Sequence, residues 1–464
     1  MARCIVPLEA GTDFSLANLP YGVIEPGGLG PRPAVAIGDY ALDLRALVLD
    51  GVLTADGARA LASERGTLDE FIALEPSAWA SVRAALVALL SPGSPLERDG
   101  ALGKYLHRRD AVRMRLPCAI GDYTDFYSSL EHARNVGTMF RGATNALMPN
   151  WTCMPIGYHG RASSVVVSGG ADPRRPCGQL PPGDASAAPS FGASAQMDYE
   201  LELGFIIGGR ENPLGSAEPV ATAERRVFGC VLVNDWSARD IQRWEYVPLG
   251  PFGSKNFCTT ISPWVVPLAA LEDARRALPR RLPAGSASGQ RSTAAAGDGD
   301  DGGEDGGEDG DDDESSILPY LRLGAAARAR ASLSIELEVA LSRANWPAEA
   351  VVCRGNARAL YWSVAQQIAH HTVTGCNLRA GDLLATGTIS GAIPESAGCL
   401  LERTWRGERP LPMPDGSARA FLLDGDTVTM RGAAVLADGT RIGFGECVGT
   451  VMPAQLPSEG VTGG

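Results

Sequence analysis

The sequence predicts a mainly β protein of the α+β class, with a small N-terminal unit and a large C-terminal one. A chain of 464 residues exceeds what one hydrophobic core usually serves, so at least two units are expected. The 56 glycines and 32 prolines indicate many turns. From about residue 118 onward, short apolar runs alternate with Gly and Pro clusters, which is typical of strands.

Residues 1–117 are expected to form the N-terminal unit. Residues 34–37 and 40–44 alternate around Gly38-Asp39, which is a hairpin signal. Residues 69–74 and 81–90 carry apolar side chains at helical spacing, and the stretch 91–95 breaks the chain. We therefore place the domain boundary near Cys118, with the second domain covering 118–464.

The C-terminal unit is expected to be built mainly from strands. Strands are predicted at 164–168, 197–207, 227–233, 332–340, 427–430 and 447–452, and helices at 125–140, 237–244 and 360–371. Residues 284–316 differ, because Gly, Ala and Ser give way to Gly, Asp and Glu without apolar residues to offset the ordering entropy. We expect a disordered surface loop there. It is no EF-hand, because Glu314 stands where that loop requires Gly.

Charge and cysteine usage exclude several classes. The net charge is −13, but eleven acids lie between Asp298 and Glu314 without a Lys or Arg, and removing them leaves −2. This near-neutral remainder gives no electrostatic footprint for nucleic acid or an anionic membrane. The ten cysteines are scattered singly, with no C-x-x-C pair and no zinc-type spacing, which indicates reduced thiols in an intracellular protein. No apolar run approaches the roughly 18 residues of a membrane span. A cytoplasmic protein is the expectation.

Three acidic residues are candidates for one cation site. Glu200 and Glu202 alternate within the predicted strand 197–207, which would place both on one face, and Asp235 follows the apolar run 227–233. Each has an ordinary alternative. Alternating acids also occur on exposed strand faces, and an Asp before a helix commonly caps it.

A helix over 125–140 would place Asp125, Ser129 and His132 near one stripe. Asp125 could then hold a metal while His132 acts on a neighbouring water, although a single helical His is more often structural. Arg239 and Gln242, spaced i and i+3, could stabilise oxyanions together with Lys255, or could be solvated side chains. Adjacent His370 and His371 point about 100° apart and are interpreted as structural.

The sequence lacks the characteristic motifs of several other enzyme classes. There is no G-x-S-x-G elbow, since residues 387–391 read GTISG, and there is no P-loop and no G-x-G-x-x-G that opens a helix after a strand. Serine-based hydrolysis and nucleotide binding are therefore disfavoured.

Six longer motifs remain: 122–129 (DYTDFYSS), 145–151 (NALMPNW), 157–164 (GYHGRASS), 234–242 (NDWSARDIQ), 244–251 (WEYVPLGP) and 421–426 (FLLDGD). Through these motifs the chain closely resembles the fumarylacetoacetase family over nearly its whole length, apart from the acidic insert. One departure is Gly253-Ser254, where the family pattern has Leu-Gly before the lysine.

The resemblance implies a small SH3-like N-terminal barrel, a large C-terminal β-roll of mixed strands, and a homodimer with a divalent cation in each active site. Carried onto this sequence, the cation ligands would be Asp125, Glu200, Glu202 and Asp235, with Lys255 and Thr259 supporting them. Such a set of oxygen ligands suits Mg²⁺ or Ca²⁺ and does not choose between them.

The resemblance also implies catalytic roles. His132 would be the base toward water and Glu402, within 400–405 (LLERTW), would orient it. Oxyanion and carbanion stabilisation would fall to Arg239, Gln242 and Lys255. The implied substrate contacts are Tyr127, Arg141, Tyr158, Gln242 and Thr388.

The activity implied is hydrolysis of a carbon–carbon bond in 4-fumarylacetoacetate, giving fumarate and acetoacetate in the last step of tyrosine breakdown. Shorter relatives with a similar acidic site act on acylpyruvates or catalyse decarboxylation, hydration or isomerisation. A second alternative is a non-catalytic protein that binds partners through its acidic insert. Intact carboxylates together with His132, Glu402 and Lys255 favour the hydrolase.

Overall fold

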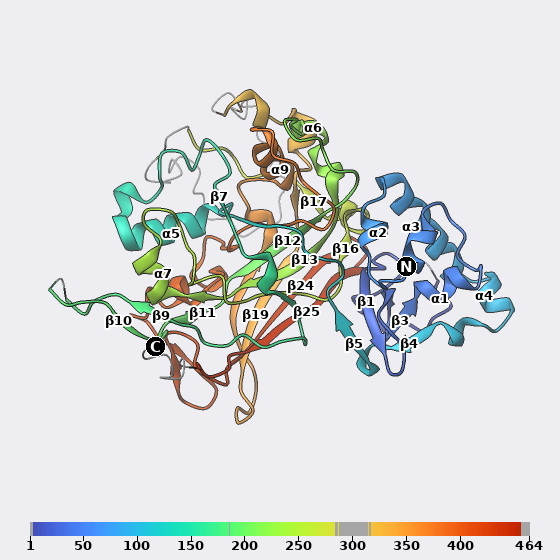
Figure 1. Cartoon of the computed structure of the whole chain (residues 1–464), viewed down its shortest axis with the longest axis horizontal. Helices are drawn as coiled ribbons and strands as arrows, with labels where there is room; N and C mark the ends of the chain where they lie inside the picture. The colour runs from blue at the N-terminus through green and yellow to red at the C-terminus, as the bar shows by residue number, and fades with distance from the viewer. Residues whose placement is uncertain (1–2, 185, 284–285, 287–313, 315–316, 456–464) are drawn as a thin grey trace, which may run out of the picture.

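The computed structural model describes residues 3–184, 186–283, 286, 314 and 317–455. The N-terminal unit, in blue at the right of Figure 1, lies beside a larger body whose centre is formed by long strands. Among the described residues, no helix has both the length and the apolar character needed to cross a membrane. All ten cysteines are described, and each is free.

The N-terminal unit is an antiparallel sheet covered by short helices. Its strand order is β4 (Leu106–Arg108), β3 (Tyr40–Asp43), β2 (Arg32–Ile37), β1 (Tyr21–Pro26) and β5 (Val112–Arg115). The helices are α1 (Leu44–Leu49), α2 (Asp69–Ile72), α3 (Pro76–Leu90) and α4 (Pro95–Arg98). The predicted hairpin is confirmed: Ile37 pairs with Tyr40, and Gly38 turns the chain at φ 53°, a value that glycine adopts easily.

The larger body contains two main sheets. The first has the order β7 (Gly157–His159), β6 (Tyr123–Phe126), β21 (Leu383–Ala385), β12 (Leu201–Ile207), β13 (Val227–Asp235), β15 (Thr259–Ile261) and β8 (Val165–Val167), with β16 (Val266–Pro267) also on β13. Its β21–β6 and β15–β8 pairs are parallel and its other pairs are antiparallel. The second sheet has the order β20 (Ala350–Asn356), β19 (Glu336–Ser342), β24 (Thr427–Val435) and β25 (Arg441–Thr450).

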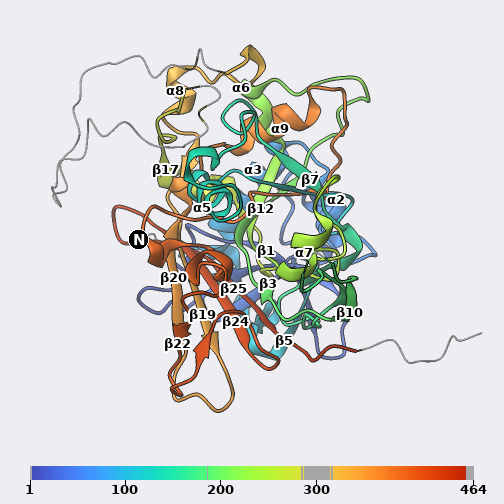
Figure 2. The ribbon, with the colours of Figure 1, turned by 90° about the vertical axis from the view of Figure 1, so that its left-hand side faces the viewer.

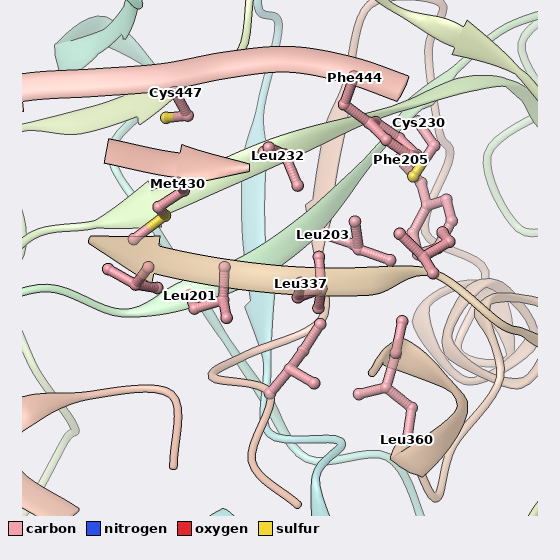
Figure 3. Close-up of a cluster of buried hydrophobic side chains, with 14 of the residues drawn as sticks. Leu201, Leu203, Phe205, Cys230, Leu232, Leu337, Leu360, Met430, Phe444 and Cys447 are labelled. Carbon is pink, nitrogen blue, oxygen red and sulfur yellow. The ribbon is translucent and has the colours of Figure 1, made fainter. Parts of the chain in front are cut away.

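The main core lies between these sheets. Leu201, Leu203 and Phe205 alternate along β12 and pack with Leu337 of β19 and Phe444 of β25 (Figure 3). Because strand side chains alternate with a period of two, this pattern turns Glu202 to the opposite face of β12. The apolar core therefore sets the direction in which a candidate site residue points.

The helices α5 (Leu130–Arg141) and α7 (Arg239–Glu245) lie at the end of the body away from the N-terminal unit (Figures 1 and 2). Helix α9 (Val364–Thr372) begins with a capping box, in which Ser363 and Gln366 satisfy each other's backbone N–H groups. The remaining helices are α6 (Val220–Ala223), α8 (Ala325–Arg328) and α10 (Leu400–Arg403). The remaining strands are β9 (Cys177–Leu180), β10 (Ser190–Ala193), β11 (Met197–Asp198), β14 (Ser237–Ala238), β17 (Arg275–Arg276), β18 (Ser332–Leu333), β22 (Leu411–Pro412) and β23 (Ala418–Arg419).

This architecture confirms the predicted fold class, a sheet-dominated α+β protein with a small N-terminal sheet and a C-terminal unit built around a large mixed sheet. The division into residues 1–117 and 118–464 stays a prediction. The insert 284–316 lies almost wholly outside the described residues. At its end, Glu314 accepts hydrogen bonds from Arg281 (3.4 Å) and Arg328 (3.2 Å).

Several predicted bounds were wrong: strand 332–340 is divided into β18 and β19, helix 237–244 begins at Arg239, and helix 360–371 begins at Val364. Two further errors concern acidic site residues. The predicted strand 197–207 is broken at Tyr199 and Glu200, because β11 pairs with β14 whereas β12 pairs with β13 and β21. The predicted helix 125–140 begins only at Leu130, with Ser129 as its N-cap. Asp125 lies instead in strand β6, which pairs in parallel with β21, so it shares no helical stripe with His132.

Candidate active site

Four carboxylates, three from strands and one from the break before β12, converge at one point of the larger sheet. Asp125 lies in β6, Glu202 in β12 and Asp235 at the end of β13, while Glu200 lies in the break just before β12. Each offers an oxygen within 4.8 Å of the others, and all four are buried. The two ordinary alternatives are therefore wrong: the glutamates are not on an exposed face, and the N-cap of α7 is Ala238 rather than Asp235.

Cationic and hydroxyl groups surround these carboxylates. The Lys255 ammonium contacts Glu200 and lies 2.6 Å from Asp235, so the departure at Gly253-Ser254 does not keep this lysine from the site. Arg239 lies 2.7 Å from Glu200. Thr259 and Tyr158 each donate to Asp235 over 3.0 Å. The predicted supporting positions thus lie beside the predicted ligands.

The pKa values of the four carboxylates shift in different directions. Burial, reinforced by Asp235, raises the pKa of Asp125 well above its usual range, and burial with Asp125 does the same for Glu202. Burial also raises the pKa of Asp235. Burial alone would raise the pKa of Glu200 too, but Arg239 and Lys255 together lower it to about 2. Without a further positive charge, the cluster therefore favours holding protons.

The orphaned oxygens of this cluster fit a divalent cation. Oδ1 of Asp125 and both carboxylate oxygens of Glu202 are buried and have no hydrogen-bond partner among the described residues. A buried carboxylate is normally paired or bound to a metal, because an uncompensated charge is costly in a low-dielectric interior. Clustered carboxylate oxygens suit hard cations. The residues present are thus compatible with a divalent-metal site.

A histidine–glutamate pair lies in the same region. Nδ1 of His132, in the first turn of α5, lies 2.6 Å from Oε2 of Glu402 in α10. Three further groups donate to this carboxylate: Ser390 (2.8 Å), Cys399 (3.1 Å) and Asn135 (2.8 Å). Burial opposes ionisation of Glu402, but His132, Asn135 and Cys399 together lower its pKa. The pair can accept a proton at Nε2 of the imidazole.

A cavity of about 480 Å³ joins these groups. It is lined by two of the carboxylates, Asp125 and Glu200, and by His132. Its other predicted site residues are Tyr127, Arg141, Tyr158, Arg239, Gln242, Lys255 and Thr388. Glu202, Asp235, Glu402 and Thr259 do not line it and lie behind those that do. The fold thus brings ten of the predicted site residues to one cavity and places the other four next to the carboxylate cluster or next to His132.

The polar side chains of the cavity lining differ in how many hydrogen bonds they already make. Arg239 donates to Gln242 through Nη1 over 3.1 Å, as the i, i+3 spacing predicted, while its Nη2 is buried and has no partner among the described residues. The hydroxyl of Thr388 is likewise buried and unpartnered within the described part of the chain. Arg141 donates to the carbonyl oxygens of Asn145 and Ala146.

Sequence reasoning missed several residues of the site. Asn135, Ser390 and Cys399 hold Glu402 but belong to no recognisable motif. Arg243 and Arg406 line the cavity and are exposed. The position of Arg243 one residue after Gln242 could have suggested it, whereas nothing local identified Arg406. The two helical histidines are structural as expected: His370 contacts Tyr320, and His371 contacts Thr124 of β6.

A mixed β body, buried carboxylates compatible with a divalent cation, and a His–Glu pair whose histidine lines the same cavity indicate a hydrolase. Comparison with known families makes the assignment specific. The family model described as "Fumarylacetoacetate (FAA) hydrolase C-terminal" matches residues 122–452, and "Fumarylacetoacetase N-terminal" matches residues 17–117. The chain belongs to the fumarylacetoacetate hydrolase family.

The similarity to individual relatives extends over almost the full chain. Fumarylacetoacetase of Rattus norvegicus is 44% identical over 461 residues, which cover 98% of this chain and 99% of the relative. The enzyme of that name from Bos taurus is 45% identical over 455 residues, covering 97% and 98%. That of Arabidopsis thaliana is 44% identical over 456 residues, covering 96% and 98%.

Proposed function

We propose that this protein hydrolyses the carbon–carbon bond of 4-fumarylacetoacetate to fumarate and acetoacetate, the last step of tyrosine breakdown. The observation that carries the proposal is the His132–Glu402 pair, 2.6 Å apart, opening onto the same cavity as the buried carboxylates. Water activation and charge stabilisation are both needed to cut a bond between two carbons, because the departing carbon is a poor leaving group. Relatives named fumarylacetoacetase, similar over almost their whole length, support the choice of substrate.

We propose that Asp125, Glu200, Glu202 and Asp235 hold a divalent cation, Mg²⁺ or Ca²⁺. The orphaned oxygens of Asp125 and Glu202 support this assignment. When bound, the cation would polarise the oxygens of the 1,3-diketone and stabilise enolate charge. Lys255 and Thr259 would keep the ligands in position through Glu200 and Asp235.

His132 acts as the base. Its Nε2 takes a proton from water as the oxygen attacks the carbonyl carbon of the fumaryl arm, and Glu402 stabilises the resulting imidazolium. The bond between that carbon and the neighbouring methylene then breaks, and its electron pair leaves with the acetoacetate fragment. The proton that His132 took from water then passes to the methylene carbon, which completes acetoacetate, while the hydroxyl oxygen stays in the fumarate carboxylate.

Arg239, Gln242 and Lys255 stabilise the negative charge that develops on oxygen. Arg239 lines the cavity and is held between Asp198 (2.8 Å) and Glu200 (2.7 Å), so its guanidinium can stabilise this charge without reorganising. Burial lowers the pKa of a lysine, but Asp235 and Glu200 outweigh this and raise the pKa of Lys255, which therefore remains a cation.

The substrate carries two carboxylates, and the cavity lining suits such an anion. Tyr127, Tyr158, Arg141 and Thr388 are the proposed substrate contacts, all of them lining the cavity. Exposed Arg243 and Arg406 add positive charge to the lining, as a second carboxylate would require.

We also propose a homodimer, as the family resemblance implies. The loop after α7 supports an association surface, because Val247, Leu249 and Phe252 are strongly exposed. Light scattering of the purified protein would give the mass directly, and a mass of one chain at micromolar concentration would contradict the dimer.

The first test of the function is loss of the diketone absorbance of fumarylacetoacetate, with product analysis for fumarate and acetoacetate. Wild type is measured with Mg²⁺ or Ca²⁺ and with EDTA, beside His132→Ala. We expect metal-dependent turnover that the variant lacks. Faster turnover of an acylpyruvate would move the protein to a related diketo acid, and no turnover with either metal would contradict the hydrolase.

A further inference from the structure

The buried carboxylate of Asp198 connects two parts of the site that lie far apart in the sequence. Asp198 ends β11, and its side chain is 0% exposed. Its Oδ1 accepts from the backbone N–H of Tyr199 (2.9 Å) and of Leu400 (2.8 Å). Its Oδ2 accepts from the backbone N–H of Leu401 (3.0 Å) and from Nε of Arg239 (2.8 Å). Both oxygens are thus fully engaged.

One of these connections fixes the helix that carries Glu402. Helix α10 is a single turn, and its N-cap residue Cys399 makes no side-chain capping bond. The first N–H groups of a helix have no partner within it and need an acceptor from outside. Asp198 supplies that acceptor for Leu400 and Leu401 across the fold. Glu402 is the next residue, so the capping sets the position from which it reaches His132.

The other connection fixes Arg239. Its guanidinium lies between Asp198 and Glu200, at 2.8 Å and 2.7 Å, so its orientation is determined from both sides. This clamp fixes the plane of the guanidinium, whose Nη1 also donates to Gln242 of the cavity lining over 3.1 Å. A guanidinium held by Glu200 alone could rotate about its side-chain bonds, and its donor would then no longer be preorganised.

We propose that Asp198 is a positioning residue, which aligns the Glu402–His132 pair and the Arg239 donor with each other. It touches neither the cavity nor the reacting atoms, and the proposal rests on the activity proposed above. A catalytic group must be held within a fraction of an ångström of its working geometry, so loss of a shared anchor affects turnover more than substrate binding.

The test is Asp198→Asn, which keeps the shape and introduces an amide NH₂. Whichever way the amide turns, its NH₂ faces two N–H donors: those of Tyr199 and Leu400, or those of Leu401 and Arg239. At least two hydrogen bonds are lost. We expect kcat to fall on the order of 100-fold, the scale for loss of an oxyanion donor, with KM changed by less than about threefold.

The matched control is Asp426→Asn. Asp426 is also 0% exposed and accepts from Arg419 (2.8 and 3.1 Å) and from the N–H of Leu423 (2.8 Å), but it does not line the cavity. We expect a comparable loss of thermal stability with kcat per folded molecule close to wild type. If Asp198→Asn does not fold, Asp198→Ser, which places no NH₂ against Arg239, gives the same comparison.

A second readout needs no substrate. A proton between Nδ1 of His132 and Glu402 at 2.6 Å gives a far-downfield NMR signal, assigned by its loss in His132→Ala. We expect this signal to shift or broaden in the Asp198 variant and to persist in the Asp426 variant. An unchanged signal with kcat within threefold of wild type would overturn the proposal, as would an equal loss of kcat in the control. If wild type does not cleave fumarylacetoacetate, the function fails while the NMR signal still decides the positioning role.

Discussion

Replacing Glu402 by glutamine removes the negative charge beside His132 and keeps the shape of the side chain. In the wild-type protein that charge lies 2.6 Å from Nδ1 of the imidazole, where it would stabilise the imidazolium of the proposed mechanism. Asn135 can turn its side-chain amide to suit the new group, so the hydrogen-bond network can largely persist. The variant therefore isolates charge from geometry.

The size of the effect follows from the distance. Two unit charges whose centres are about 4 Å apart interact by about 4 kcal/mol at an effective dielectric constant near 20. Since each 1.36 kcal/mol is a factor of ten, we expect kcat to fall on the order of 10³-fold. KM should change little, because Glu402 lies behind His132 and does not line the cavity.

The assay is initial-rate loss of fumarylacetoacetate absorbance at saturating substrate and metal. Glu218→Gln is the control, because Glu218 pairs with Arg226 at 2.5 Å and does not line the cavity. Thermal melting verifies that both variants are folded. A Glu402→Gln enzyme whose kcat remains within about threefold of wild type would refute the proposed role of the pair.

Three further predictions concern the metal cluster and the cavity. Because the folded-state pKa values of Asp125 and Glu202 are raised, their contribution to the stability of metal-free protein is full below the unfolded pKa near 4 and is lost as pH rises through the folded values. The Tm of EDTA-treated protein should therefore fall as the pH rises above 4, and the increase in Tm caused by Mg²⁺ should become larger over the same range. Calorimetry should detect proton release when Mg²⁺ binds. An increase in Tm that does not change with pH would contradict the raised pKa values. Lys255→Met removes the cation between Glu200 and Asp235. We therefore expect kcat to fall on the order of 100-fold and the metal-free protein to become less stable, which steady-state kinetics and thermal melting would measure. An unaltered kcat would exclude the lysine from catalysis. Arg406→Gln should raise KM for the dicarboxylate about tenfold, with a smaller change for an analogue that lacks the distal carboxylate, as expected for a charge-assisted hydrogen bond. The control is Arg409→Gln, because Arg409 stacks on Trp405 and does not line the cavity. Equal KM changes in the two variants would count against a role of Arg406 in binding the substrate.

Local sequence pattern was sufficient for the elements whose neighbours in space are neighbours in the chain. The hairpin around Gly38 and the i, i+3 relation of Arg239 and Gln242 follow from turn geometry and helical periodicity, and both are present. The apolar run before Asp235 was also sufficient to predict β13, because a buried strand is continuously apolar. The identity of the complete site came from motifs shared with a family rather than from periodicity.

Tertiary structure alone decided how those residues meet. Asp125 has helix-like spacing to His132, yet it lies in a strand because β6 pairs in parallel with β21, more than 250 residues further along the chain. Glu402 meets His132 from 270 residues away, and Asp198 holds both α10 and Arg239. Periodicity reports only which face of its own element a residue occupies. Which elements come together depends on long-range strand pairing and core packing, and these placed the four carboxylates and the His132–Glu402 pair beside one cavity.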